Sequence, residues 1–136
     1  MTSVPLPPKS AETFQTVCQF CIVGCGYKVF KWPEGKSGAP EADGNALGID
    51  FRQQQSADSI WVSPNMHSVV TDKDGTRKNV IIIPDNECSV NGGLASVRGA
   101  GLAQTLYAPD RDTKARLKKP LLLGVNGHTD VDWDEA

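Results

Sequence analysis

Residues 13–32 read TFQTVCQFCIVGCGYKVFKW and combine two strand-like patterns with a cluster of cysteines. Residues 13–17 alternate β-forming and polar side chains, and residues 27–32 alternate polar and apolar side chains with a period of two. Such alternation indicates β-strands, and Pro33 ends the second one because proline lacks a backbone N–H. Three cysteines stand between the two expected strands: Cys18, Cys21 and Cys25. The sequence therefore predicts a cysteine loop flanked by strands.

The spacing of these cysteines, C-x2-C-x3-C, favours a single metal centre. A disulfide framework spreads its cysteines to join distant loops, whereas these three lie within eight residues. Spacings of two and three residues let one loop wrap an iron–sulfur cluster, with each thiolate on a different iron. Gly24 and Gly26 suit such a loop because glycine accepts positive φ. Apolar neighbours would exclude water from the cluster: Phe20, Ile22 and Val23.

Two other interpretations of the cysteines stay open. Zinc prefers four ligands, commonly in pairs, and neither His67 nor His128 has a ligand-like neighbour. Cysteines are also common as small buried core residues. A four-iron cluster would need a fourth ligand, for which Cys88 is the nearest spare thiol, although the sequence around Cys88 also fits a buried apolar position.

The rest of the chain predicts an α+β fold with small antiparallel sheets and short helices. Nine prolines and thirteen glycines in 136 residues imply many turns. Residues 33–59 are polar and are expected to form a long surface loop with little regular structure. Residues 67–71 and 79–83 flank a turn with Gly75 at its tip and predict a hairpin.

Further along, residues 91–107 predict a glycine-broken loop that becomes a short helix near Gly99. Residues 116–123 form a short apolar segment behind a basic one. Asp132 is a good N-cap with Glu135 three residues later, a helix-start signal at which the sequence stops. We therefore expect three parts: an extended arm at residues 1–12, an iron–sulfur-binding domain at residues 13–130, and the truncated start of another domain at residues 131–136.

Composition and charge exclude several classes of function. A formal net charge of −2 gives no basic footprint for nucleic acid. No apolar run approaches the roughly 18 residues of a membrane span, and the N-terminus has neither a secretory pattern nor a twin-arginine pair. We interpret Trp32 and Trp61 as core or interface aromatics, and the two histidines as structural or exposed. A basic run is interpreted as a solvated face, with docking of an acidic partner as the alternative: Lys114, Arg116, Lys118 and Lys119.

A second motif gives the cysteine loop a family resemblance. An N-terminal C-x2-C-x3-C followed much later by C-x-[K/R]-G resembles the cluster-binding pattern of the molybdopterin oxidoreductase superfamily. In this chain the second half reads Ser96-Val97-Arg98-Gly99, with serine where the fourth cysteine would stand. The strings CQFCIVGCGYKVFKWP and CSVNGGLASVRGAGLA are similar to those of the arsenite oxidase large-subunit family. The resemblance runs from about Thr16 to Ala136.

This resemblance implies a [3Fe–4S] cluster on Cys18, Cys21 and Cys25, because a neutral hydroxyl is a poor ligand beside soft sulfides. Ser96 is then expected to line the electron path. Arg98 is expected to lie between the cluster and a pterin of the molybdenum cofactor; the alternative is a solvated charge or a residue that faces a phosphate. That cofactor would be bis-molybdopterin guanine dinucleotide, bound mainly outside this chain, and no catalytic residue is expected within these 136 residues.

The resemblance also implies a function and partners. The larger enzyme would oxidise arsenite to arsenate at molybdenum, and this segment would pass the electrons to a Rieske [2Fe–2S] small subunit. A soluble cytochrome or copper protein would accept them next. The location would be the periplasm, reached with a signal-bearing partner subunit; the alternative is the cytoplasm. Two rivals stay open: a related molybdopterin oxidoreductase with another substrate, and a stand-alone small iron–sulfur or zinc protein.

Overall fold

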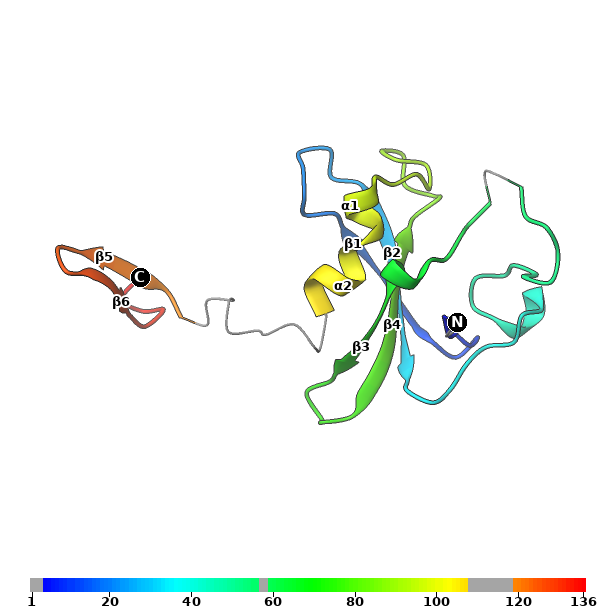
Figure 1. Ribbon diagram of the computed structural model, residues 1–136, viewed down its shortest axis with the longest axis horizontal. Helices are drawn as coiled ribbons and strands as arrows, with labels where there is room; N and C mark the ends of the chain where they lie inside the picture. The colour runs from blue at the N-terminus through cyan, green and yellow to red at the C-terminus, as the bar shows by residue number, and fades with distance from the viewer. Residues whose placement is uncertain (1–3, 57–58, 108–118) are drawn as a thin grey trace.

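The computed structural model describes residues 4–56, 59–107 and 119–136. The fold is α+β, as predicted, with a four-stranded antiparallel sheet in the order β1-β2-β4-β3 and a two-stranded hairpin, β5-β6 (Figure 1). The strands are β1 (Glu12–Val17), β2 (Gly26–Pro33), β3 (His67–Thr71), β4 (Arg77–Pro84), β5 (Leu121–Gly124) and β6 (Gly127–Asp130). The helices are α1 (Val97–Ala100) and α2 (Leu102–Tyr107), with the 3-10 turns η1 (Ala42–Gly44) and η2 (Pro64–Met66).

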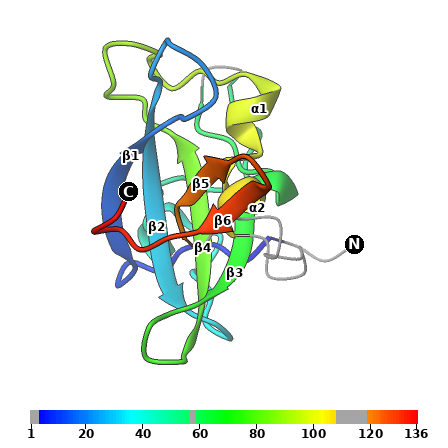
Figure 2. The same ribbon diagram turned by 90° about the vertical axis from the view of Figure 1, so that its left-hand side faces the viewer.

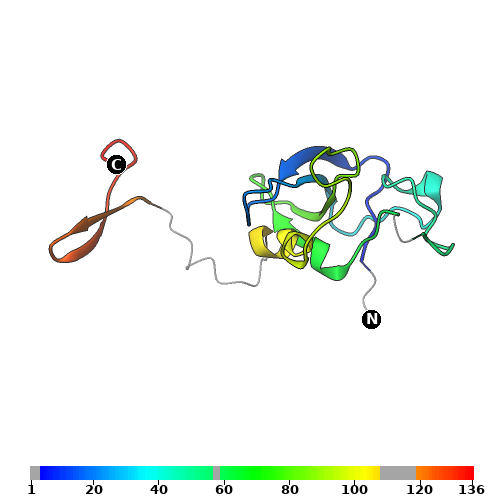
Figure 3. The same ribbon diagram turned by 90° about the horizontal axis from the view of Figure 1, so that it is seen from above.

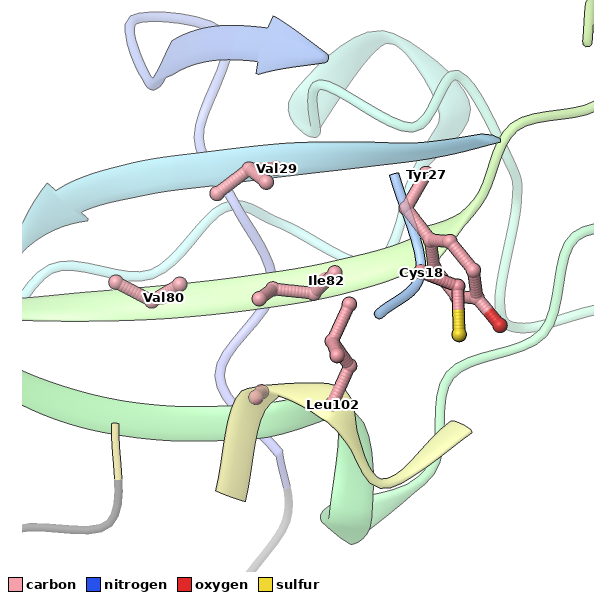
Figure 4. Close-up of a cluster of buried hydrophobic side chains, with 7 residues drawn as sticks. Cys18, Tyr27, Val29, Val80, Ile82 and Leu102 are labelled. Carbon is pink, nitrogen blue, oxygen red and sulfur yellow. The ribbon is translucent and has the colours of Figure 1, made fainter. Parts of the chain in front are cut away.

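Strands β2 and β4 form the centre of the sheet, and their apolar side chains alternate between its two faces. Val29 pairs with Ile82, and Phe30 pairs with Ile81. One face buries Cys18, Tyr27, Val29, Val80 and Ile82 against Leu102 and Ala103 of α2 (Figure 4). The other face buries Phe30, Trp32, Met66, Ile81, Ile83 and Ala100. Full burial of a large apolar side chain contributes about 1.5–3 kcal/mol, so this two-sided core holds β2 firmly and positions the loop that precedes it.

Three segments gather at one end of the sheet. The loop of residues 18–25 connects β1 to β2, and residues 85–96 connect β4 to α1. Both lie beside α1 at the end of the sheet opposite the β3–β4 turn (Figures 1 and 2). Helix α2 continues from α1 and contacts β3 and β4. The topology therefore brings the cysteine loop and the Ser96 segment together.

The strands predicted from alternation are confirmed. The observed β1 and β2 cover the expected residues 13–17 and 27–32, and Pro33 is the last residue of β2. The expected hairpin is also present, although β4 begins two residues early, at Arg77. The helix expected near Gly99 is α1, and Gly101 separates it from α2.

The long polar loop after β2 is irregular, as predicted, but it is not only a surface excursion. Asn45 is fully buried, and its Nδ2 lies 3.1, 2.7 and 2.9 Å from the carbonyl oxygens of Ala39, Glu41 and Ile49. The segment extends to one side of the sheet (Figure 3), and Ala46 and Leu47 pack against the core on that side. Alternation does not reveal a loop that is organised by one buried amide.

The C-terminal hairpin lies away from the four-stranded sheet (Figures 1 and 3). Every residue of β5 and β6 is exposed. The expected apolar segment, residues 116–123, overlaps β5 at residues 121–123, and its residues 116–118 lie outside the described residues. Lys114, Arg116 and Lys118 of the basic run also lie outside them, and Lys119 is exposed. His128 lies in β6 and is exposed, in agreement with its interpretation as a structural or exposed histidine. Asp132 is followed by a single turn, in which Ala136 N–H donates to its carbonyl oxygen over 3.1 Å.

Trp32 and His67 have structural roles, as predicted. Trp32 is a core residue, whereas Trp61 is 46% exposed. His67 begins β3 and its Nε2 lies 3.0 Å from Asn79 Oδ1, so this histidine is structural. Among the described residues, no helix has the length and apolar character needed to cross a bilayer.

Candidate functional site

The cysteine loop is the connection of the β1–β2 hairpin. Val17 pairs with Gly26 in the strand ladder. One step further, Cys18 N–H donates to the Cys25 carbonyl oxygen over 2.8 Å. This hydrogen bond closes the loop, so the register of the two strands holds the first and third cysteines together. Gly24 within the loop has φ +66°, in the left-handed region that glycine adopts without a Cβ penalty.

A pocket of about 530 Å³ opens between this loop and the start of α1. That volume falls within the range of about 300–1,000 Å³ typical of ligand sites. Its lining residues are Cys18, Phe20, Cys21, Val23, Cys25, Tyr27, Ser96, Val97 and Arg98. All five site residues predicted from the sequence are therefore brought together around one pocket, although they come from two distant segments of the chain.

All four cysteines are free thiols. Cys18 is buried, Cys25 is half-buried and Cys21 is exposed. Within the described residues, no three Cys, His, Asp or Glu side chains lie close enough to hold one metal ion. A single zinc ion takes about four ligands at once, whereas an iron–sulfur cluster spreads its thiolates over several irons. The donor set and the size of the pocket therefore fit a cluster.

Cys88 does not line this pocket. It lies against the base of the loop, where a Cβ built on Gly26 would be 2.7 Å from its Sγ. The backbone N–H of Val90 holds the pKa of Cys88 below its ordinary value; burial opposes this, and the N–H groups of Asn91 and Gly26 add to it. Cys88, the spare thiol that could serve as a fourth ligand, thus packs against the base of the loop.

Ser96 combines two positions in the site. It is the N-cap of α1, and its Oγ accepts a hydrogen bond from Gly99 N–H over 3.4 Å. Ser96 also lines the same pocket as the cysteine loop. Arg98 lies on the same rim and is exposed, so its guanidinium group is available to a charged neighbour.

Tyr27 was not predicted as a site residue, yet it forms part of the pocket wall. Its side chain is 1% exposed, and its hydroxyl and the sulfur of Cys18 point toward the same end of the buried cluster (Figure 4). Burial, followed by the nearby thiols of Cys18, Cys25 and Cys21, raises the pKa of Tyr27 to about 12. The hydroxyl therefore stays protonated at neutral pH. Alternation in β2 places Tyr27 on the face of Val29, which is the signal that could have identified it.

Two further residues that sequence reasoning missed join the two halves of the site. Asn91 Oδ1 accepts a hydrogen bond from Gly26 N–H over 2.9 Å, and Asn91 Nδ2 donates to the Gly26 carbonyl over 3.2 Å. Asp85 N–H also donates to that carbonyl over 3.0 Å. The Asp85 carbonyl in turn accepts from Cys88 and Gly93. No motif or periodicity marks these contacts, because they join segments far apart in the sequence.

Comparison with known proteins identifies the relatives of the chain. The family described as Rieske 3Fe-4S matches residues 18–113. The arsenite oxidase subunit AioA of Herminiimonas arsenicoxydans is 47% identical over 133 residues, which cover 98% of this chain and 16% of the relative. Two iodate reductase subunits IdrA, from Pseudomonas sp. (strain SCT) and Denitromonas iodatirespirans, are 45% and 43% identical, over 98% of this chain and 15% of each relative.

The chain thus spans about a sixth of the length of these curated relatives. The matched range begins at the first cysteine of the loop and includes every residue that lines the pocket. The resemblance to arsenite oxidase and the molybdopterin oxidoreductases, inferred from the cysteine and serine motifs, is confirmed. The chain belongs to the Rieske 3Fe-4S family.

Proposed function

We propose that the pocket holds an iron–sulfur cluster on Cys18, Cys21 and Cys25, and that the chain conducts electrons within an arsenite oxidase-type molybdenum enzyme. One observation carries this proposal: the three cysteines of the β1–β2 loop and Ser96 of the α1 N-terminus line the same pocket. The family match over residues 18–113 supports it.

The donor set favours a cluster of three irons. Thiolates are suited to iron–sulfur clusters, whereas a neutral hydroxyl is a weak ligand for iron beside sulfides. Each cysteine would ligate one iron, and the corner facing Ser96 would hold none. A bound [3Fe–4S] cluster supplies a one-electron relay.

The surrounding side chains would tune this relay. Phe20, Val23 and Val97 line the pocket with apolar groups, but they are 40%, 55% and 90% exposed, so within this chain they would shield the cluster from water only in part. Ile22, expected in the same apolar shell, is fully exposed and does not line the pocket. Solvent exposure of a cluster influences its reduction potential. Arg98 provides a cation at the rim. We assign Arg98 and Ser96 to the electron path, with Arg98 directed toward the pterin of the molybdenum cofactor.

In the whole protein, we propose that arsenite is oxidised to arsenate at a bis-molybdopterin guanine dinucleotide centre formed mainly by residues outside this chain. Two electrons leave each arsenite, and a one-electron cluster would pass them singly to a Rieske [2Fe–2S] small subunit. A soluble cytochrome or copper protein would follow in the periplasm, which the enzyme would reach with a signal-bearing partner. The 47% identity to an arsenite oxidase subunit supports this assignment.

A second candidate function is iodate reduction, because two IdrA subunits are 45% and 43% identical to the chain. The two functions differ in the direction of electron flow. We expect the full-length protein to reduce an electron-accepting dye with arsenite, and not to oxidise reduced viologen with iodate. The opposite result would transfer the assignment to iodate reductase and leave the proposed cluster untouched.

The cluster itself is tested by alanine substitution of each cysteine in the full-length protein. Cys18→Ala, Cys21→Ala and Cys25→Ala are each expected to lower bound iron and sulfide and to abolish the paramagnetic signal of an oxidised three-iron cluster. Cys88→Ala is the matched control, because Cys88 lies outside the pocket, and it should keep both. Zinc in place of iron, or iron lost only with Cys88→Ala, would overturn the proposal.

A further inference from the structure

Tyr27 is held rigidly in the wall of the cysteine pocket. Its ring is 1% exposed and packs with Val29, Ile82 and Leu102 in the core between the sheet and α2 (Figure 4). In β2 it pairs with Thr16 on one side and Pro84 on the other. Because the strand pairing and the core hold the backbone and the ring of Tyr27, its hydroxyl is placed at the wall of the pocket.

The position of this hydroxyl depends on Gly99 in α1. A Cβ built on Gly99 would lie 1.8 Å from the Tyr27 hydroxyl oxygen and 3.0 Å from the ring carbon that bears it. Both distances are shorter than carbon and oxygen atoms tolerate without moving. Gly99 is buried and has no positive φ, so backbone conformation does not call for a glycine here. The space that the missing Cβ leaves is the space that the hydroxyl fills.

We propose that Tyr27 is a positioning residue for the redox centre: its hydroxyl donates a hydrogen bond to a sulfur of the cluster's ligand sphere, and Gly99 leaves room for it. The inference rests on the proposed cluster. The geometry behind it is that Tyr27 and Cys18 belong to one buried cluster, in which the hydroxyl and the sulfur point toward the same end (Figure 4), and that both residues line the pocket of three thiols. A hydrogen bond to cluster sulfur stabilises the more negative, reduced state and so raises the reduction potential.

The decisive variant is Tyr27→Phe in the full-length protein loaded with its cluster, because it removes the hydroxyl and keeps the ring. We expect about a tenfold shift of the reduction equilibrium toward the oxidised form, about 59 mV for one electron. Potentiometric titration followed by electron paramagnetic resonance measures this shift. In deuterated water, the wild type should show a deuteron coupled to the cluster that Tyr27→Phe lacks.

Trp32→Phe is the matched control on the opposite face of the sheet. It also removes a buried donor, since Trp32 Nε1–H donates to the Lys36 carbonyl over 2.8 Å. We expect it to lower the thermal midpoint of unfolding and to leave the potential unchanged. If Tyr27→Phe behaves in the same way, Tyr27 is structural only and the inference fails.

Gly99→Ala reaches the same hydroxyl without changing the tyrosine, and it keeps the inference testable if Tyr27→Phe does not fold. The Cβ that Gly99→Ala adds should displace the hydroxyl, and the reduction potential should fall as it does in Tyr27→Phe. In the double variant, Gly99→Ala should lower the reduction potential little further than Tyr27→Phe alone, because both changes act through the same hydroxyl. Additive shifts would overturn the inference. A wild-type protein without any iron–sulfur cluster would instead refute the proposed function, whereas a cluster with unchanged potentials refutes the tyrosine's role alone.

Discussion

The Ser96 hydroxyl accepts a hydrogen bond from the backbone N–H of Gly99 and at the same time lines the pocket of the three cysteines. The distance of 3.4 Å is long beside the usual range of about 2.7–3.2 Å for such bonds. The helix it caps, α1, has only four residues. One residue thus caps the helix and lines the pocket of the thiols. A substitution there should change both the stability of the helix and the chemistry of the pocket, and the two effects can be measured separately.

Ser96→Cys should complete the ligand set. A fourth thiolate facing the pocket should convert the three-iron cluster to a four-iron cluster, and its negative charge should lower the reduction potential. Loss of the serine cap should cost about 1 kcal/mol of stability. The measurement is paramagnetic resonance: the signal of the oxidised protein should disappear, and a new one should appear on reduction.

Ser96→Ala is the control for that experiment, because it removes the cap and supplies no ligand. It should lose a similar amount of stability and keep the three-iron signal. A three-iron spectrum in Ser96→Cys would show that this side chain does not face the vacant corner of the cluster.

Gly24 and Gly35 form a matched pair for testing the cysteine loop. Their φ angles are +66° and +83°, and a Cβ at either position meets no close neighbour: only Val17 Cγ1 at 3.7 Å for Gly24, and nothing within 4 Å for Gly35. Alanine at each should therefore cost about 1–2 kcal/mol through backbone strain alone. Only Gly24→Ala should also lower the iron content, because only Gly24 lies in the loop. Equal iron retention in both variants would contradict the role of that loop conformation.

Much of this fold could be predicted from local patterns. Period-two alternation located β1 and β2, and the Asp74-Gly75 turn located the β3–β4 hairpin. The glycine-rich run predicted a short helix near Gly99, which is α1, but not the second helix α2 that follows Gly101. The cysteine spacing and the Ser96 motif identified residues that line one pocket. Each of these patterns involves only residues that are close together in the sequence.

The residues that local sequence patterns did not identify make contacts between segments far apart in the sequence. Asn91 pairs with both backbone groups of Gly26, and Asn45 organises a loop that looks merely polar. A single amide has no periodicity, and its value depends on which carbonyls the fold brings within reach. Tyr27 was visible as a strand residue, but its proximity to Gly99 arises only when α1 packs beside β2.

Gly26→Ala should destabilise the base of the loop by overpacking. The new Cβ would lie 2.7 Å from Cys88 Sγ and 2.9 Å from Cys88 Cβ, and such crowding typically costs about 1–3 kcal/mol. Cys88→Gly removes both atoms, so the double variant should recover part of the loss relative to the sum of the single changes. Denaturant unfolding of the four proteins measures this coupling. Strict additivity would show that the two residues do not meet.

The pair of Asp85 and Lys28 ties the end of β4 to β2. Lys28 Nζ lies 3.2 Å from Asp85 Oδ1, and the Asp85 side chain is 5% exposed. Burial opposes ionisation, but the Glu87 backbone N–H and the Lys28 ammonium outweigh it and hold the pKa of Asp85 below its usual value. Lys31 and Asp72 form a similar pair over 3.0 Å further along β2, where Asp72 is 31% exposed.

Asp85→Asn should lower the free energy of unfolding at pH 7 by about 1–3 kcal/mol, because it weakens a buried charged hydrogen-bond network. Asp72→Asn should lower it less, since solvent weakens an exposed pair. A carboxyl whose pKa is lowered in the folded state contributes stability above its unfolded pKa of about 3.9 and loses it as the pH falls through the folded value. The difference in free energy of unfolding between wild type and Asp85→Asn, measured in urea, should therefore shrink as the pH falls below about 4. A difference that stays constant from pH 7 to about pH 2 would mean that Asp85 acts through packing and not through its charge.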